Sequence, residues 1–215
     1  RPLACHDVVG KGACGGLGQA LERGLRGQGA EGALVGRDAE HLEMLAALAP
    51  GRSAVYSLDV ADAAAMQAMA HDWMQRSGVP DLVIANAGVA GGYATAQADD
   101  LAVFRRMLEI NLLGVATTFQ PFLAAMQAQA RPASLVGVAS IAGWRGLPGN
   151  GAYCASKAGL IAYLQSLRAE LRGTGVTVHT VSPGYLRTAP SRLATISPCP
   201  ACWSRRLRHR LCCNA

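Results

Sequence analysis

Apolar positions along the chain follow two alternating patterns, which predict alternating strands and helices. Short apolar runs of the kind that form buried strands lie at residues 8–9, 32–35, 54–58, 81–85, 134–139 and 176–181. Apolar residues three or four apart predict helices at 17–25, 39–49, 63–75, 101–130 and 152–172, the fourth with an irregularity at Pro121. Strand, helix and parallel strand in repetition indicate the α/β class. We therefore expect a Rossmann-like, doubly wound parallel sheet in three α/β/α layers, with ligands at the carboxyl ends of its strands.

Composition supports one folded domain. Of the 215 residues, 51% are hydrophobic and 16% are charged, which supplies a large core and excludes a disordered chain. There is no run of 18 uncharged apolar residues and no apolar signal segment at the N-terminus, so we expect no membrane association. Three scattered cysteines (Cys5, Cys14 and Cys154) fit a reduced, cytoplasmic protein.

The end of the chain differs from its body. Five of the 20 basic side chains and none of the 14 acidic ones lie beyond residue 188, so the body is nearly neutral despite the net charge of +6. Four of the seven cysteines are in the last 17 residues, at a spacing that matches no usual zinc site. We expect a dinucleotide-binding domain at 1–188 and an atypical, aberrant Cys/Arg/Pro-rich tail at 189–215, so that the C-terminal portion of the domain is incomplete. Neither a metal nor nucleic acid is expected as a ligand.

A glycine-rich turn follows the first predicted strand. Its candidate cofactor contacts are Gly12, Cys14, Gly16, Leu17 and Gly18. Glycines let the backbone approach a pyrophosphate, and the N-terminus of the following helix supplies N–H donors. A glycine turn without a ligand is the alternative.

Three further candidates follow the next predicted strands. Arg37 suits the 2′-phosphate of NADP by charge and shape, unless it pairs with a neighbouring acid such as Asp38 or Glu40. Asp59, with Val60 after it, either accepts a hydrogen bond from adenine or caps the next helix. Another candidate is the run Asn86, Ala87 and Gly88, whose small residues let the backbone pass close to a cofactor, although an ordinary turn is the alternative.

The strongest candidate chemistry is the pair Tyr153 and Lys157. Their spacing of four places them on one face of a helix. A neighbouring ammonium favours the ionised phenol, which suits proton transfer near neutral pH. Ser140, at the end of the preceding strand, can donate a hydrogen bond to a substrate oxygen. Alone, the pair also fits a half-buried tyrosine beside a solvated lysine.

Taken together, residues 8–188 resemble the short-chain dehydrogenase/reductase family. The glycine motif, Asn86-Ala87-Gly88, Asn111, Ser140, Tyr153, Lys157 and the run Pro183-Gly184-Tyr185-Leu186-Arg187-Thr188 occur in the family's order and spacing. The resemblance implies that Tyr153 is the general acid/base, that Lys157 binds the nicotinamide ribose, and that Ser140 orients the substrate. It further implies that Asn111 holds a water in a proton relay. Pro183, Gly184 and Thr188 would contact the nicotinamide half of the cofactor.

The function implied is hydride transfer between a nicotinamide cofactor and a carbonyl or secondary alcohol, with NADP(H) favoured over NAD(H). The resemblance also implies a homodimer or homotetramer, formed through the helices at 101–130 and 152–172. There, Ala155, Ala158, Gly159 and Ala162 permit close helix approach.

Three departures from the family pattern keep an alternative open. Lys11 stands where the family has Thr, and Ala85 replaces the first Asn of Asn-Asn-Ala-Gly. The residues after 188 do not show the pattern of a substrate lid, a helix and a last strand. The alternative is a catalytically impaired dinucleotide-binding or dimerising protein.

Overall fold

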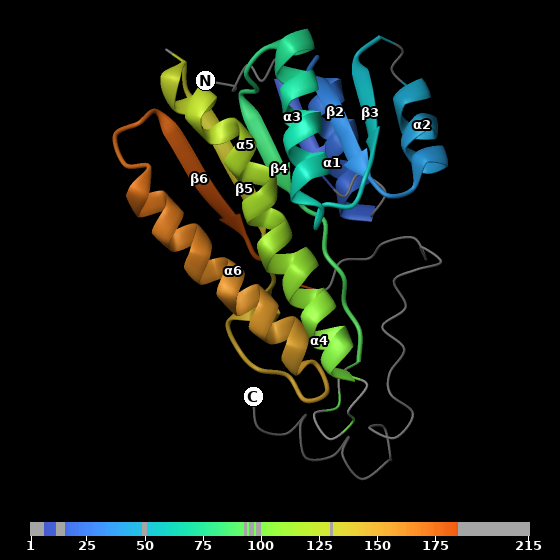
Figure 1. The fold of residues 1–215 in the computed structure, drawn as a ribbon, viewed down its shortest axis with the longest axis vertical. Helices are drawn as coiled ribbons and strands as arrows, with labels where there is room; N and C mark the ends of the chain where they lie inside the picture. The colour runs from blue at the N-terminus through green and yellow to red at the C-terminus, as the bar shows by residue number, and fades with distance from the viewer. Residues whose placement is uncertain are drawn as a thin grey trace.

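A six-stranded parallel sheet forms the centre of the molecule (Figure 1). The computed structural model describes residues 7–11, 16–48, 51–92, 94, 97, 100–129 and 131–184. The strands are β1 (Asp7–Lys11), β2 (Glu31–Gly36), β3 (Ser53–Ser57), β4 (Leu82–Ala85), β5 (Ala133–Val138) and β6 (Val176–Val181). Their order is β3-β2-β1-β4-β5-β6, so the direction of winding reverses between β1 and β4. This order confirms the predicted doubly wound sheet, which binds ligands at such a reversal.

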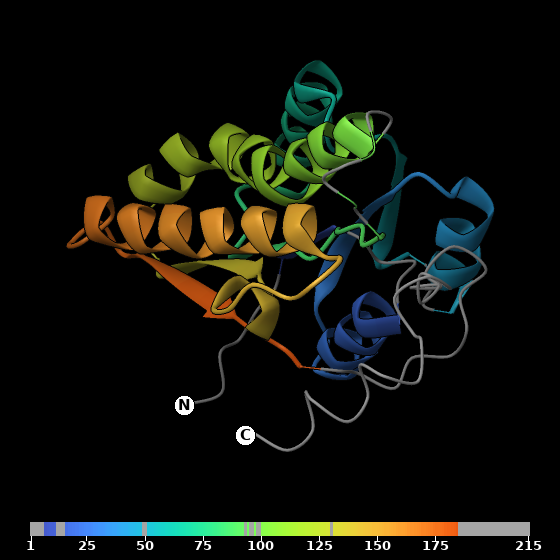
Figure 2. The same ribbon diagram turned by 90° about the horizontal axis from the view of Figure 1, so that it is seen from below.

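Helices cover both faces of the sheet. They are α1 (Gly16–Gly27), α2 (Ala39–Ala47), α3 (Ala63–Ser77), α4 (Asp100–Leu108), α5 (Gly114–Ala128) and α6 (Gly151–Glu170). Figure 2 shows α4 to α6, in green to orange, over one face and α1, in dark blue, against the other. In the part of the chain that the structure describes, no helix is long and apolar enough to cross a membrane.

Strands β2 and β4 are mostly apolar because both of their faces are buried. In β2, Ala33 and Val35 join the large core beneath α3, α5 and α6, whereas Leu34 packs with Leu42 and Leu45 of α2. The residues of β4 divide in the same way between that core and a smaller cluster under α1. Burial on both faces explains the continuous apolar runs that predicted these strands.

The long helix predicted at 101–130 is interrupted, but not at Pro121. A π-helical turn at Glu109–Leu113 separates α4 from α5, and Gly114 N–H donates to Glu109 O, five residues earlier. Pro121 lies inside α5, which loses only the hydrogen bond that a proline cannot donate. The predicted position of the irregularity was therefore wrong. The turn instead holds Asn111, whose side chain is fixed by distant partners.

The described residues cover only one face of strand β6. Val176 and Val178 are buried, whereas Thr177, His179 and Val181 on the other face are exposed. Residues 185–215 lie outside the described part of the chain, so the predicted domain boundary at 188 stays a prediction.

Candidate active site

Candidate residues follow five of the six strands, at the carboxyl edge of the sheet. Arg37 follows β2, Asp59 follows β3, Asn86 follows β4, Ser140 follows β5, and Pro183 follows β6. Because all the strands are parallel, their carboxyl ends meet at this edge. The edge includes the point between β1 and β4 where the strand order reverses. The fold therefore brings together chemistry that is spread over about 150 residues of sequence.

The start of α1 lies beyond β1 at the same edge. Gly16 begins the helix, Leu17 packs half-buried against the cluster under the sheet, and Gly18 is buried. The first N–H groups of such a helix have no partner within it, so they can bind a phosphate. The other predicted contacts of this kind, Gly12 and Cys14, lie outside the described residues, as does Thr188.

Lys157 is buried in the middle of the candidate site. Only 3% of the residue is exposed, and its Nζ donates to Val138 O at 2.8 Å. Its Nζ lies 6.0 Å from the centre of the Tyr153 ring, at the edge of the cation–π range. Among the described residues no carboxylate pairs with it, and burial lowers the pKa of the Lys157 amine to about 8. Burying an amine without a counter-charge destabilises the fold. Such an amine is therefore a candidate for a functional residue.

Ser140 is held beside Lys157 by a short 3-10 turn, Ile141–Gly143. The Ser140 Oγ accepts a hydrogen bond from Ala142 N–H at 3.2 Å, which caps this turn and leaves the hydroxyl proton to donate. The turn packs directly on α6: a Cβ at Gly143 would lie 2.9 Å from Lys157 O. Tyr153, one helical turn before Lys157, is half-buried on the same helix.

Asn111 connects three elements of the site. Its Oδ1 accepts from Val89 N–H at 2.8 Å, and its Nδ2 donates to Val89 O at 2.9 Å and to Ser156 Oγ at 3.0 Å. The Asn111 side chain thus fixes the segment that follows β4. The predicted role of Asn111 in a water relay stays a prediction. A Cβ at Gly88 would lie 3.4 Å from both Asn111 Oδ1 and Lys157 Nζ, so a small residue suits this narrow passage.

Ser156 is a residue of the site that the sequence analysis did not single out. It is buried, and its Oγ donates to Tyr153 O at 2.7 Å while accepting from Asn111. It therefore links Asn111 to the backbone of the helix that carries Tyr153 and Lys157. Its position between these two residues, on the buried side of a predicted helix, was the available signal.

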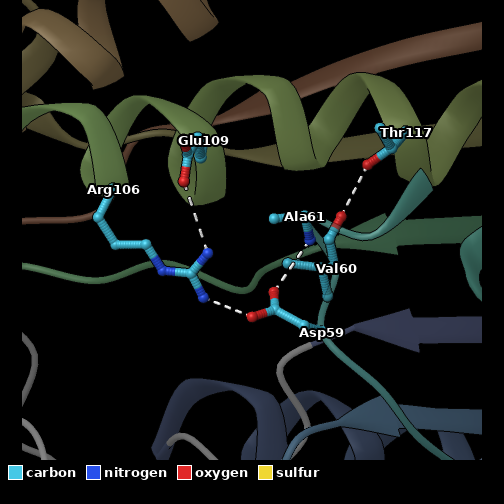
Figure 3. Close-up of polar contacts among 6 residues, drawn as sticks. All are labelled: Asp59, Val60, Ala61, Arg106, Glu109 and Thr117. Atoms are coloured by element: carbon cyan, nitrogen blue, oxygen red, sulfur yellow. Dashed lines mark hydrogen bonds and ion pairs between the residues drawn. The ribbon is translucent and has the colours of Figure 1, made fainter.

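Asp59 lies in a network of polar contacts beyond β3 (Figure 3). Its Oδ1 accepts from Ala61 N–H at 3.0 Å, and its Oδ2 forms an ion pair with Arg106 of α4. Arg106 also approaches Glu109 Oε2 at 3.6 Å. Burial raises the pKa of the Asp59 carboxyl, but the Ala61 hydrogen bond and the arginine charges outweigh it and hold the pKa below its usual value.

The alternative that Asp59 caps the following helix is wrong. The N-cap of α3 is Asp62, whose side chain accepts from Ala65 N–H at 3.0 Å. Val60 is buried, and its carbonyl accepts from the Thr117 hydroxyl at 2.8 Å, a second tie between this turn and the long helix (Figure 3). Arg106 was missed because its partner is 47 residues away, beyond any local pattern.

Arg37 is exposed at the end of β2, where a cofactor ribose is expected. The carboxylate of its neighbour Asp38 accepts from His41 N–H at 3.0 Å and caps α2. Within the described ranges, no three His, Cys, Asp or Glu side chains gather as a metal site. Cys154 is a free, buried thiol whose Sγ accepts from Leu147 N–H at 3.3 Å.

Comparison with known proteins identifies the family. A family model described as short chain dehydrogenase matches residues 8–195. An uncharacterized oxidoreductase of Myxococcus xanthus is 38% identical over 189 residues, which cover 86% of this chain and 74% of the relative. A short-chain dehydrogenase structure from Streptomyces avermitilis superposes with a TM-score of 0.78 at 28% identity, covering 86% of this chain and 67% of the other. A metagenomic short-chain oxidoreductase, solved in complex with NADP, gives 0.76 at 30% identity, covering 85% and 83%.

The match extends over most of the chain and over the whole described sheet. It agrees with the strand order. The chain belongs to the short-chain dehydrogenase family of oxidoreductases.

Proposed function

We propose that the protein is an NADP(H)-dependent oxidoreductase that interconverts a carbonyl compound and a secondary alcohol, with Tyr153 as the general acid/base. The observation that carries this proposal is the buried Lys157 amine beside Tyr153 and Ser140, without a carboxylate partner in the described structure. Such an amine is expensive to bury, and ribose hydroxyls of a bound cofactor would supply the acceptors it lacks.

The residues present fit a nicotinamide dinucleotide. The start of α1 would bind the pyrophosphate. The absence of a side chain at Gly88 would leave room for the cofactor beside Asn111 and Lys157. Arg37 would bind the 2′-phosphate, which favours NADP(H) over NAD(H). Asp59 and Val60 would contact adenine, while Pro183, Gly184 and Thr188 would line the nicotinamide end. NADP is the ligand named for one of the related structures.

In the proposed reaction, the bound cofactor supplies or accepts a hydride at its nicotinamide C4. Ser140 would orient the substrate by donating a hydrogen bond from its hydroxyl to the substrate oxygen. In the reductive direction Tyr153 would then transfer its phenolic proton to that oxygen, and Lys157 would stabilise the resulting phenolate. Asn111 and Ser156 would hold the catalytic helix in register.

The apolar surroundings of the site favour a small or medium-sized hydrophobic substrate. Ile141, Trp144 and Leu147, in the segment between Ser140 and α6, are 50%, 66% and 39% exposed. Apolar side chains that stay exposed beside catalytic groups are typical of a substrate entrance.

We further propose a cytoplasmic homo-oligomer, either a dimer or a tetramer, that binds no nucleic acid. An apolar groove runs along α4, the π-helical turn and α6; it is lined mainly by Leu101, Phe104, Leu108, Leu112, Leu113 and Tyr163. Ala155, Ala158 and Ala162 on α6 are exposed, as helix pairing between subunits requires, whereas Gly159 packs against Leu112 of its own chain. The cytoplasmic location rests on the scattered cysteines, of which Cys154 is free.

Cofactor binding and turnover, measured separately, test the proposal. NADPH fluorescence titration should show binding, and a panel of ketones and quinones should yield at least one that is reduced. Tyr153→Phe should abolish turnover and leave the dissociation constant for NADPH unchanged. Binding without turnover of any panel member would instead support the catalytically impaired alternative, and an unchanged rate in Tyr153→Phe would refute the mechanism.

A further inference from the structure

Asp59 lies between two arginines that come from different elements. Gly36 of β2 is opposite Ser57 of β3, and Leu58 N–H donates to Gly36 O at 2.8 Å, so Arg37 and Asp59 leave neighbouring strands side by side. From the other side, Arg106 of α4 forms an ion pair with the Asp59 carboxylate (Figure 3). Asp59 thus pairs with Arg106 and follows the strand next to the one that Arg37 follows.

Arg106 is held in place by a second carboxylate. Its Nη1 is 3.6 Å from Glu109 Oε2, one helical turn further along, and Figure 3 shows the guanidinium between the two acids. Asp59 is in turn fixed by the Ala61 N–H. The ion pair is therefore built into the turn that follows β3, and 40% of the Arg106 side chain is exposed.

Together, Arg37, Arg106, Asp59 and Glu109 have balanced charge. Without Arg106, the Asp59 and Glu109 carboxylates would lose the cation that pairs with both, and the negative charge near the expected phosphate site would be uncompensated. Burial raises the pKa of the Asp59 carboxyl, but the Ala61 hydrogen bond and the charges of Arg106 and Arg37 lower it overall, which agrees with the position of Asp59 near both arginines.

We propose that Arg106 determines coenzyme specificity: by neutralising Asp59 it leaves Arg37 available to bind the 2′-phosphate of NADP(H). This inference rests on the proposed function, in which Arg37 binds that phosphate. Arg106 acts through Asp59 and does not touch the cofactor, so it is a positioning residue. Without it, Asp59 attracts Arg37 and repels the 2′-phosphate.

The test is the ratio of the dissociation constants for NADH and NADPH, each measured by fluorescence titration. In Arg106→Gln this ratio should fall about two- to fivefold, the size of an exposed charge interaction, through weaker NADPH binding alone. The loss should shrink in about 1 M salt, where the screening length is about 3 Å. Arg106→Lys, which keeps the charge, should retain most of the ratio.

Two further variants separate charge from structure. Adding Asp59→Asn to Arg106→Gln removes the uncompensated carboxylate and should restore the ratio, since the amide oxygen still accepts from Ala61. Arg131→Gln is the matched control: Arg131 pairs with Asp81 at 2.9 Å before β4, at the opposite edge of the sheet, and its loss should leave the ratio unchanged.

Three outcomes would overturn the inference. An unchanged ratio in Arg106→Gln contradicts it, and so does an equal loss of NADH and NADPH binding, which indicates a merely structural role. A wild-type protein that binds NADH more tightly than NADPH, or neither, contradicts the proposed cofactor itself. That last outcome appears before any variant is made, so the two failures are distinguishable.

Discussion

Replacing Lys157 by Met should stabilise the folded protein at neutral pH, although it removes a residue of the proposed catalytic site. The amine is buried, and its pKa of about 8 lies well below the usual 10.5 because burial penalises the charged form. At pH 7 the Lys157 amine is charged in both states, and this charge is less favourable in the folded state than in the unfolded state. Methionine has a similar length and carries no charge.

The expected gain follows from the pKa shift. A shift from 10.5 to about 8 corresponds to roughly 3 kcal/mol of destabilisation while the amine is charged in both states. The substitution also removes the hydrogen bond to Val138 O, which costs about 1 kcal/mol. The variant should therefore be more stable than wild type by about 2 kcal/mol at pH 7.

The pH dependence has a definite sign. Between pH 8 and 10.5 the unfolded state binds more protons at this group than the folded state, so the wild type gains stability as the pH rises. Below pH 8 the cost of the charge is fully present, and above 10.5 it is gone. The advantage of Lys157→Met should accordingly shrink over this window and reverse once only the lost hydrogen bond remains.

Urea unfolding of both proteins at pH 7, 9 and 10.5 measures these differences. Arg145→Met, which replaces an exposed cation, is the control and should show no such pH dependence relative to wild type. A wild type that is as stable as Lys157→Met at pH 7, or a difference that does not vary with pH, would refute the argument that a buried charge destabilises this site.

Two other substitutions test how the site is built. Ser156→Ala should lower the free energy of unfolding by about 1–3 kcal/mol, because it leaves the buried Asn111 amide without one partner, and should lower kcat more than it raises KM. Denaturant unfolding and steady-state kinetics measure the two effects, and wild-type values for both would contradict the bridging role. Gly143→Ala should cost about 1–3 kcal/mol, because its Cβ would meet the backbone of α6 at 2.8 Å, whereas Gly146→Ala, with nothing within 4 Å, should be neutral. Thermal unfolding of this pair shows whether the 3-10 turn packs as tightly as described, and equal effects would contradict it.

The features that local sequence determines were predictable. Apolar runs and helical spacing located all six strands, and β2 to β6 each contribute apolar side chains to the large core. The rule that ligands bind at the carboxyl ends of parallel strands predicted that Arg37, Asn86 and Ser140 lie at the same edge of the sheet. The N-cap of α3 was assigned to the wrong residue: Asp59 was offered as the alternative, whereas Asp62, which directly precedes the helix predicted to begin at 63, is the cap.

The features that depend on distant partners were not predictable. An irregularity of the long helix was expected at Pro121, but the π-helical turn occurs around Asn111, whose side chain binds Val89 and Ser156. Arg106 had no local signal, because its partner Asp59 lies on another element. A periodic pattern reports which face of a helix is buried, but it does not report which polar groups meet across the fold.

The central claim, that this chain transfers hydride with Tyr153 as the proton donor, is tested most directly by isotope transfer. NADPH that carries deuterium at the transferred position of C4 is incubated with a panel ketone, and the alcohol is analysed by mass spectrometry. We expect deuterium on the carbinol carbon with the wild type, and no alcohol with Tyr153→Phe although that variant binds NADPH. Alcohol without deuterium, or labelled alcohol formed equally fast by Tyr153→Phe, would contradict the account.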